Sequence, residues 1–176
     1  MPDGRSKMEL ESSGDARERT IRWSDTGSGL AALPGMTGLD FLRAIRDGEL
    51  PAAPISSPML MRLEEVDDGR VVFSCEPDES LYNPIGSVHG GVMCTILDSA
   101  LGCAAHSTLP AGIGYTSIEI KVNYLRPVQI GAGTLTAIGT VTKRGRRVIF
   151  ADGEVRDAAG NVVATASSSL LVFPLG

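Results

Sequence analysis

Alternating apolar and polar residues predict six short strands in this chain. The first two runs, MLMRLEEV from residue 59 and RVVFSCEP from residue 70, flank DDGR, which is typical of a hairpin turn. Three later runs are separated by the turns KRGR and DAAGN: GTLTAIGTVTKRG, RVIFADGEVRD and NVVATASSSLLVF. Between these groups, YTSIEIKVNYL alternates throughout, which predicts one face with Ile118, Ile120, Val122 and Tyr124 and another with Ser117, Glu119, Lys121 and Asn123.

A long apolar segment, residues 83–107, lies between the second and third strands and predicts a helix. Its apolar side chains leave little polar face, which is typical of a helix buried on most sides. They are Val92, Met93, Ile96, Leu97, Ala100, Leu101, Ala104 and Ala105. Two strands, one long helix and four strands joined mostly by hairpins predict an α+β fold, in which a curved antiparallel sheet wraps around a long central helix.

Composition divides the chain into three parts. Residues 1–30 are polar and rich in Gly, Ser and charge, so we expect them to be mobile. Residues 31–57 contain TGLDFLRAIRDG, a predicted short helix capped by Thr37 and ended by Gly48, followed by the proline-rich ELPAAPISSP. Residues 58–176 hold the predicted sheet and central helix.

Length, charge and cysteine content narrow the function classes. The chain has 176 residues, 43% of them hydrophobic, and a net charge of −5, which fits one globular domain without a general nucleic-acid footprint. The three cysteines lie in apolar runs and the two histidines are far apart, so we expect reduced thiols and no metal site. Without an apolar leader or a run long enough to span a membrane, a cytoplasmic protein is the expectation.

Asp98 raises the question of function. It is the only side chain between Ser80 and Ile118 that is fully charged at neutral pH. An isolated buried carboxylate is costly, so Asp98 either reaches a polar cavity or has a chemical role.

The sequence around Asp98 resembles the helix motif of the PaaI-like (phenylacetate-degradation type) hotdog-fold acyl-CoA thioesterases. In that motif an Asn precedes HGG, and an Asp follows eight residues after the first Gly, as Asn83, His89–Gly91 and Asp98 do here. The strand ending NYLRPV, residues 123–128, is also similar. The resemblance implies a hotdog fold and hydrolysis of an aryl- or fatty acyl-CoA to the free acid and coenzyme A. It implies no separate cofactor, because coenzyme A is part of the substrate.

Thioester hydrolysis needs an oxyanion donor and a group that activates or delivers the nucleophile. We expect the Gly90 N–H to be the main donor, with Gly91 beside it, because a helix N-terminus exposes unpaired N–H groups and glycine lets a ligand approach. The alternative is that these glycines only start the helix. Asp98 would be the general base or the nucleophile, and the residues do not decide between the two. The alternative for Asp98 is a structural carboxylate.

Three further polar residues are candidates by position. Asn83 could hold the attacking water or the thioester carbonyl, or could simply form the turn before Pro84. His89 could contact the thioester but more often such a residue braces the loop. Ser117 matches a strand position that supports the carboxylate in some family members, with Thr116 as the neighbouring candidate and a solvent-facing residue as the alternative.

Five cations could bind the phosphates of coenzyme A. They are Arg126 and the turn residues Lys143, Arg144, Arg146 and Arg147, for which a solvated turn is the alternative. Cys94 and Cys103 have no paired histidine, so a cysteine nucleophile is not expected. We expect His106, near the end of the helix, to be a cap or a surface residue.

Spacing along the helix also predicts an assembly. Gly90 and Asp98 are separated by roughly 12 Å along an α-helix, yet both must lie within about 3 Å of one reacting group. Two antiparallel copies of the helix could place Gly90 of one chain opposite Asp98 of its partner. We therefore expect a two-fold homodimer with two sites across its interface. The resemblance implies that such dimers often pair into homotetramers.

Two other functions stay open. A hotdog enoyl-CoA hydratase would use a histidine and a carboxylate positioned together. His89 and Asp98 are nine residues apart along one element, and the HGG…Asp spacing suits a thioesterase better. A non-catalytic acyl-CoA-binding protein would keep the pocket but needs an output module, and the N-terminal region offers only one short helix.

Overall fold

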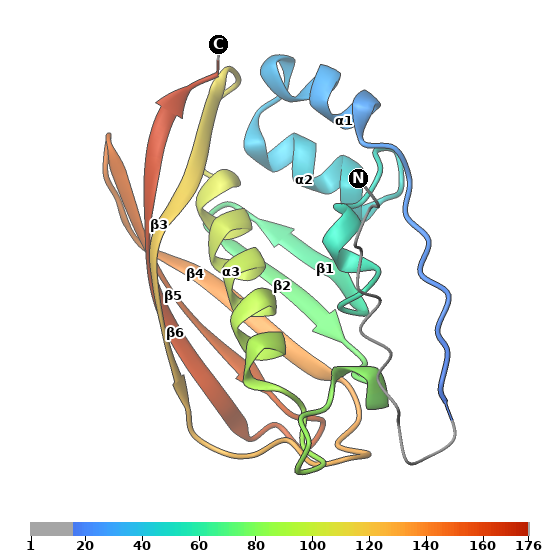
Figure 1. Cartoon of the computed structure of the whole chain (residues 1–176). Coiled ribbons are helices and arrows are strands. Elements are labelled where there is room, and N and C mark those ends of the chain that lie inside the picture. The colour runs from blue at the N-terminus through green and yellow to red at the C-terminus, as the bar shows by residue number, and fades with distance from the viewer. Residues whose placement is uncertain (1–15, 176) are drawn as a thin grey trace, which may run out of the picture.

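The computed structural model describes residues 16–175, and a six-stranded antiparallel sheet in it curves around one long helix (Figure 1). The strand order is β1-β2-β4-β5-β6-β3, so β1 and β3 form the two edges. The predicted α+β fold, including two strands before the helix and four after it, is confirmed. The strands are β1 (Met61–Asp67), β2 (Arg70–Cys75), β3 (Ile113–Tyr124), β4 (Leu135–Arg144), β5 (Val148–Arg156) and β6 (Val162–Pro174).

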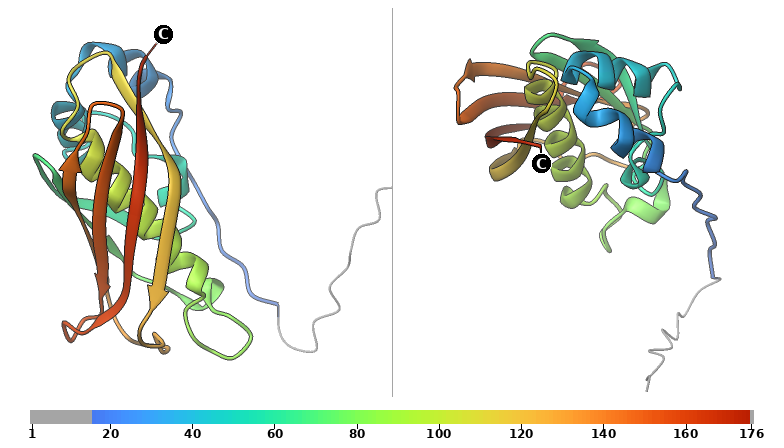
Figure 2. Two further views of the ribbon diagram at one scale, coloured as in Figure 1. Left: turned by 90° about the vertical axis from the view of Figure 1, so that its left-hand side faces the viewer. Right: turned by 90° about the horizontal axis from the view of Figure 1, so that it is seen from above.

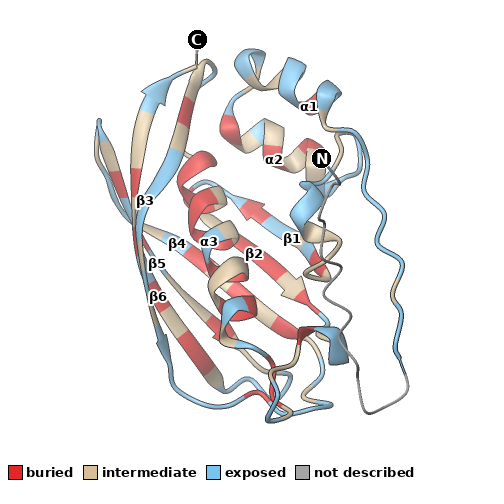
Figure 3. Cartoon of the chain, in the orientation of Figure 1, coloured by how far each residue is buried: buried red, intermediate tan, exposed pale blue. Residues whose placement is uncertain are grey.

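The central helix α3 (Gly90–His106) packs its apolar side on the concave face of the sheet. Leu97 and Leu101 on the helix are fully buried in one core cluster with sheet residues such as Leu135 and Val155. Figure 3 shows buried positions on α3 and on the strands that it packs against. The opposite side of α3 is open, and Asp98 is exposed on it. In a single chain, Asp98 is therefore not a buried carboxylate, because the sheet covers only one side of the helix.

A leader of short helices precedes the sheet and lies at the C-terminal end of α3 (Figure 2). In α2, Thr37 accepts a hydrogen bond from the Asp40 amide at 3.2 Å, which confirms the predicted cap. The Gly38 amide donates to the Leu109 carbonyl at 3.0 Å, and a Cβ on Gly38 would lie only 1.8 Å from the His106 carbonyl oxygen. Glycine thus allows the close packing of α2 on α3. The leader elements and the turn before α3 are α1 (Gly27–Ala32), η1 (Leu33–Gly35), α2 (Gly38–Arg46), η2 (Pro54–Ser56) and η3 (Glu79–Leu81).

Residues 16–26 run extended beside η2 and η3. Arg19 holds this segment through Asp78 at 3.1 Å and the Pro58 carbonyl at 2.7 Å. Residues 1–15, part of the segment expected to be mobile, lie outside the described residues, and the mobility of residues 1–30 stays a prediction. None of the helices within residues 16–175 is long and apolar enough to cross a lipid bilayer.

Strand β3 does not alternate regularly, because its pairing with β6 shifts between Ser117 and Glu119. This β-bulge inserts Ile118 and moves the alternation by one residue. Ser117 before the bulge and Tyr124 after it both contact α3, whereas Lys121 lies on the outer face of the sheet. The predicted face that joined Ser117 with Lys121 is therefore wrong.

Candidate active site

The loop before α3 is shaped by Asn83. Its side-chain oxygen accepts hydrogen bonds from the backbone amides of Ile85 and Ser87, both at 3.1 Å. The backbone N–H of Asn83 donates to the Ser87 carbonyl at 2.8 Å. Asn83 thus acts as a turn-former in this structure. Its side-chain nitrogen, 3.5 Å from Ser87 Oγ, is the part left to contact a ligand.

His89 is the N-cap of α3. Its Nδ1 accepts a hydrogen bond from the Gly91 amide at 2.8 Å, and its own amide donates to the Leu81 carbonyl at 2.9 Å. The His89 carbonyl also accepts from the Val92 amide at 2.9 Å. His89 therefore braces the loop, and the Gly91 N–H, expected beside Gly90 as a donor, is already taken.

The Gly90 amide is left free at the start of α3. It donates no hydrogen bond to any group within residues 16–175, and it lies at the positive end of the helix dipole. Tyr124 packs over it: Tyr124 Oη donates to the Gly90 carbonyl at 3.1 Å, and a Cβ on residue 90 would lie 3.1 Å from Tyr124 Cζ. A hollow of about 310 Å³ opens here, with Asn83, Met93 and Arg126 in its lining. Tyr124 was not among the predicted site residues, although the similar strand ending NYLRPV contains it.

Asp98 is held by Ser117. On the open side of α3, Ser117 Oγ donates a hydrogen bond of 2.8 Å to Asp98 Oδ1. The second carboxylate oxygen, Oδ2, accepts no hydrogen bond from any group within the described residues. Thr116, the other strand candidate, is exposed on the opposite face of β3. Between these two candidates, Ser117 is the residue that the fold brings to Asp98.

Gly90 and Asp98 lie on the same helix, eight residues or roughly 12 Å apart along its axis. The structure thus forms two half-sites in one chain. One joins the Gly90 amide with Asn83, His89 and Arg126, and the other joins Asp98 with Ser117.

The candidate phosphate-binding cations lie at opposite ends of the sheet. Arg126 lines the hollow at Gly90, whereas the β4–β5 turn lies near the C-terminal end of α3. There Arg144 forms an ion pair with Asp68 of the β1–β2 turn at 2.8 Å. In the same turn, the Gly69 N–H donates a hydrogen bond to Ser107 Oγ at the end of α3. The remaining cations of this turn are exposed: Lys143, Arg146 and Arg147.

Two titratable groups on α3 are held in their neutral forms near pH 7, the buried His106 and the half-buried Cys103. His106, expected as a cap or surface residue, is only 7% exposed, because it is stacked between Phe41 of α2 and Tyr115 of β3. Burial lowers the pKa of His106 to about 4, so the ring is neutral near pH 7. Burial raises the pKa of the Cys103 thiol to about 12, which keeps the thiol protonated near pH 7.

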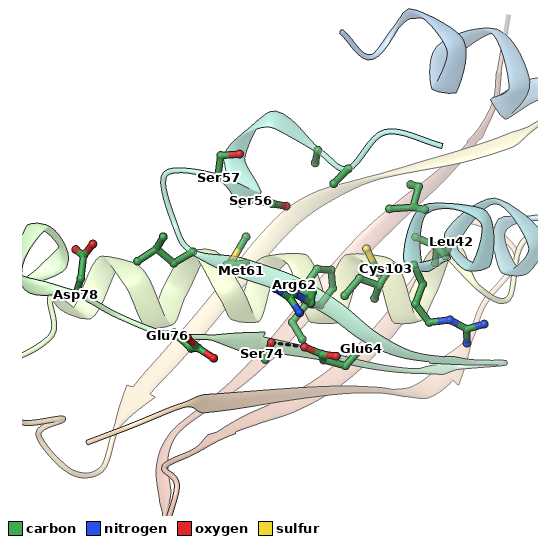
Figure 4. A pocket seen from close by; sticks show the side chains of 17 residues that line it. Leu42, Ser56, Ser57, Met61, Arg62, Glu64, Ser74, Glu76, Asp78 and Cys103 are labelled. Atoms are coloured by element: carbon green, nitrogen blue, oxygen red, sulfur yellow. Dashed lines mark hydrogen bonds between the residues drawn. The ribbon is translucent and has the colours of Figure 1, made fainter. Parts of the chain in front are cut away.

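A larger hollow of about 710 Å³ lies elsewhere, between η2, β1 and α3 (Figure 4). Leu42, Met61 and Cys103 give it an apolar wall, and charged side chains such as Glu76 and Asp78 lie along it. None of the candidate site residues lines it. The candidate residues Asn83, Gly90 and Arg126 instead line the smaller hollow, where the Gly90 N–H is free.

Comparison with known proteins agrees with the fold. The thioesterase superfamily matches residues 85–164. A protein of Halobacterium salinarum that is named as an esterase is 32% identical over 122 residues, covering 63% of this chain and 79% of its own length. Human acyl-coenzyme A thioesterase 13 is 26% identical over 97 residues, 54% of this chain and 68% of its own. A phenylacetic-acid-degradation-related thioesterase structure from Ralstonia eutropha superimposes with a TM-score of 0.68 at 26% identity, covering 74% of this chain and 98% of that one.

Proposed function

Because the chain belongs to the PaaI-like hotdog thioesterases of the thioesterase superfamily, we propose that it hydrolyses an acyl-CoA thioester to the free acid and coenzyme A. The observation that carries this proposal is the 2.8 Å hydrogen bond from Ser117 to Asp98 Oδ1. It fixes the carboxylate and leaves Oδ2 to act on a water molecule or on the thioester carbon. The name of the human relative, an acyl-coenzyme A thioesterase, supports the substrate class.

The reaction would use the two half-sites together. Asp98 takes a proton from water, whose oxygen adds to the thioester carbonyl carbon, and the resulting oxyanion accepts a hydrogen bond from the Gly90 N–H. The carbon–sulfur bond then breaks, and the leaving coenzyme A thiolate takes up the proton that Asp98 accepted from water. In the covalent alternative, Asp98 itself adds to the carbonyl carbon, the carbon–sulfur bond breaks and the coenzyme A thiolate leaves. Water then opens the resulting mixed anhydride, which yields the free acid and regenerates Asp98.

A homodimer would bring the half-sites together. Strand β3 is an edge strand with Ile118 and Tyr124 more than half exposed, and such edges favour pairing with another strand. Antiparallel pairing of two β3 strands would set Gly90 of one chain against Asp98 of its partner. We also propose that two such dimers pair into a tetramer. The molar mass measured by light scattering distinguishes a dimer from a tetramer.

The same pairing would bring the cations of both chains to one end of the proposed active site. The β4–β5 turn lies at the Ile113 end of β3 and Arg126 lies just beyond its Tyr124 end, so antiparallel strands place the turn of one chain near Arg126 of the other. Lys143, Arg146 and Arg147 could then attract the phosphates of coenzyme A.

The test is thiol release from a panel of aryl- and fatty acyl-CoAs, for the wild type and Asp98→Asn. We expect the wild type to turn over and the variant to lose about 10²-fold or more in kcat, the usual scale for a positioned acid or base. The matched control Asp152→Asn, on the exposed outer side of β5, should keep full activity. Binding of acyl-CoA without thiol release would contradict the proposal and favour a non-catalytic binder, and hydration of an enoyl-CoA would favour a hydratase.

A further inference from the structure

The bulge in β3 decides where Ser117 points. Ser117 pairs with Leu170 of β6 and Glu119 pairs with Ser169, so Ile118 is the extra residue. In a regular strand, the face that carries Ser117 would also carry Glu119 and Lys121. The bulge instead lets Ser117 face α3 while the apolar Ile120 and Val122 also face it, and the charged residues face outward.

A buried hydroxyl group fastens this bulge. Ser168 is only 3% exposed and lies in the inward-facing row of β6, between the buried Ala166 and Leu170. Its Oγ donates a hydrogen bond of 2.6 Å to the Glu119 carbonyl, the first carbonyl after the extra residue. A buried hydroxyl without a partner is costly, and a bulge disrupts the regular ladder of backbone bonds, so this contact satisfies both groups.

We propose that Ser168 is a positioning residue of the active site, which holds the bulge that aims Ser117 at Asp98. The connection runs from Ser168 Oγ to the Glu119 carbonyl, through the backbone of the bulge to Ser117, and from Ser117 Oγ to Asp98 Oδ1. Ser168 does not touch the reacting atoms. This inference rests on the proposed function, because it assigns Ser168 a part in the same hydrolysis.

The test compares Ser168→Thr with Ser168→Val, two side chains of nearly the same shape that differ in the hydroxyl group. We expect Ser168→Val to lose about 10-fold in kcat with KM changed less than about twofold, because small misplacements of a catalytic group can cost up to about 10²-fold. Ser168→Thr keeps a donor and should retain most of kcat. Ser167→Val, at the exposed neighbour, is the control and should behave as the wild type.

A double variant separates positioning from general loss of structure. Once Ser117→Ala has removed the hydroxyl that the bulge aims, adding Ser168→Val should cost no further activity. Equal kcat for Ser168→Thr and Ser168→Val, or an additional loss in the double variant, would overturn the proposal. If Ser168→Val fails to fold, Ser168→Ala replaces it in every comparison.

Crystal structures of the variants give a readout that does not depend on activity. In the Ser168→Val structure the distance from Ser117 Oγ to Asp98 Oδ1 should exceed hydrogen-bond range, whereas Ser168→Thr should keep it near 2.8 Å. An unchanged distance in Ser168→Val overturns the inference. An inactive wild type would instead overturn the proposed function, and the distance would still test the role of Ser168.

Discussion

At the scale of single residues, the Gly90 N–H is a group of the candidate site whose orientation is fixed by its neighbours. Its neighbours are fixed by hydrogen bonds: His89 Nδ1 takes the Gly91 N–H, the His89 carbonyl accepts from Val92, and Tyr124 holds the Gly90 carbonyl. A donor that is already oriented needs no reorganisation when charge develops on the substrate. The proposed oxyanion donor is thus already oriented in the chain without substrate.

A pair of substitutions at Gly90 tests the N–H itself. Proline removes the N–H yet suits the first position of a helix, and the extended His89, with ψ of 136°, suits the residue before proline. Alanine keeps the N–H and adds a Cβ that Tyr124 must yield to by a few tenths of an ångström. We expect Gly90→Pro to lose a further 10²–10³-fold or so in kcat relative to Gly90→Ala. Equal steady-state kinetics for two folded variants would exclude the amide as donor.

The sequence identified some of these residues and not others, for a physical reason. Gly90 and Asp98 belong to a motif with fixed spacing, so a linear pattern finds them, and Ser117 was a candidate because it matches a strand position in some family members. Tyr124 contacts Gly90, 34 positions away, and Ser168 contacts Glu119, 49 positions away. No local sequence pattern predicts contacts between such distant segments. The sequence also left open whether Asp98 is buried, because an apolar run does not tell which side of a helix the sheet covers.

At the scale of elements, His106 of the central helix packs against α2 of the N-terminal leader. Its ring lies 5.6 Å from that of Phe41 on α2 and 5.3 Å from that of Tyr115 on β3, measured between centroids. A ring sandwiched in this way must stay neutral to remain buried. The docking of α2 on α3 is therefore coupled to the protonation of one histidine.

This coupling predicts a loss of stability in mild acid. The pKa of His106 is about 4 in the fold and near 6.5 in the unfolded chain, so between these values the unfolded chain binds more protons. The stabilisation is complete above the unfolded value and is lost as the pH falls toward 4. Between about pH 8 and pH 5 the free energy of unfolding should fall by about 2 kcal/mol from this group. Urea unfolding measures it, and His106→Phe should remove that part of the dependence. Parallel pH dependences for wild type and variant would show that His106 is not responsible.

Periodicity predicted the elements well because each long strand and the central helix bury one face. The predicted alternation of β3 is correct from Ile120 to Tyr124 but misplaces Ser117, because a bulge changes the backbone count without changing the residue pattern. The packing of α2 was not predicted either, since it depends on Gly38 touching the α3 backbone.

At the scale of the whole molecule, one chain carries its candidate residues in two separate groups. The free amide of Gly90 and the Ser117–Asp98 pair are separated along α3, and β3 is an unpaired edge. A two-fold axis beside β3 would complete both sites at once, because each chain supplies to its partner the half that the partner lacks there. The proposed activity is then a property of the dimer.

Mixed dimers test this division directly. Asp98→Asn and Gly90→Pro should each be inactive alone, since both sites of each homodimer lose one essential group. A dimer with one chain of each kind keeps one intact site and should recover about half of the wild-type activity. Co-expression with two different affinity tags isolates that dimer for the thiol-release assay. The control pairs Asp98→Asn with Ser117→Ala: these residues belong to the same half-site, so their mixed dimer has no intact site and should stay as slow as its parents. Recovery in neither mixture would mean that Gly90 and Asp98 act within one chain, and recovery in the first alone would place the hydrolysis at the subunit interface.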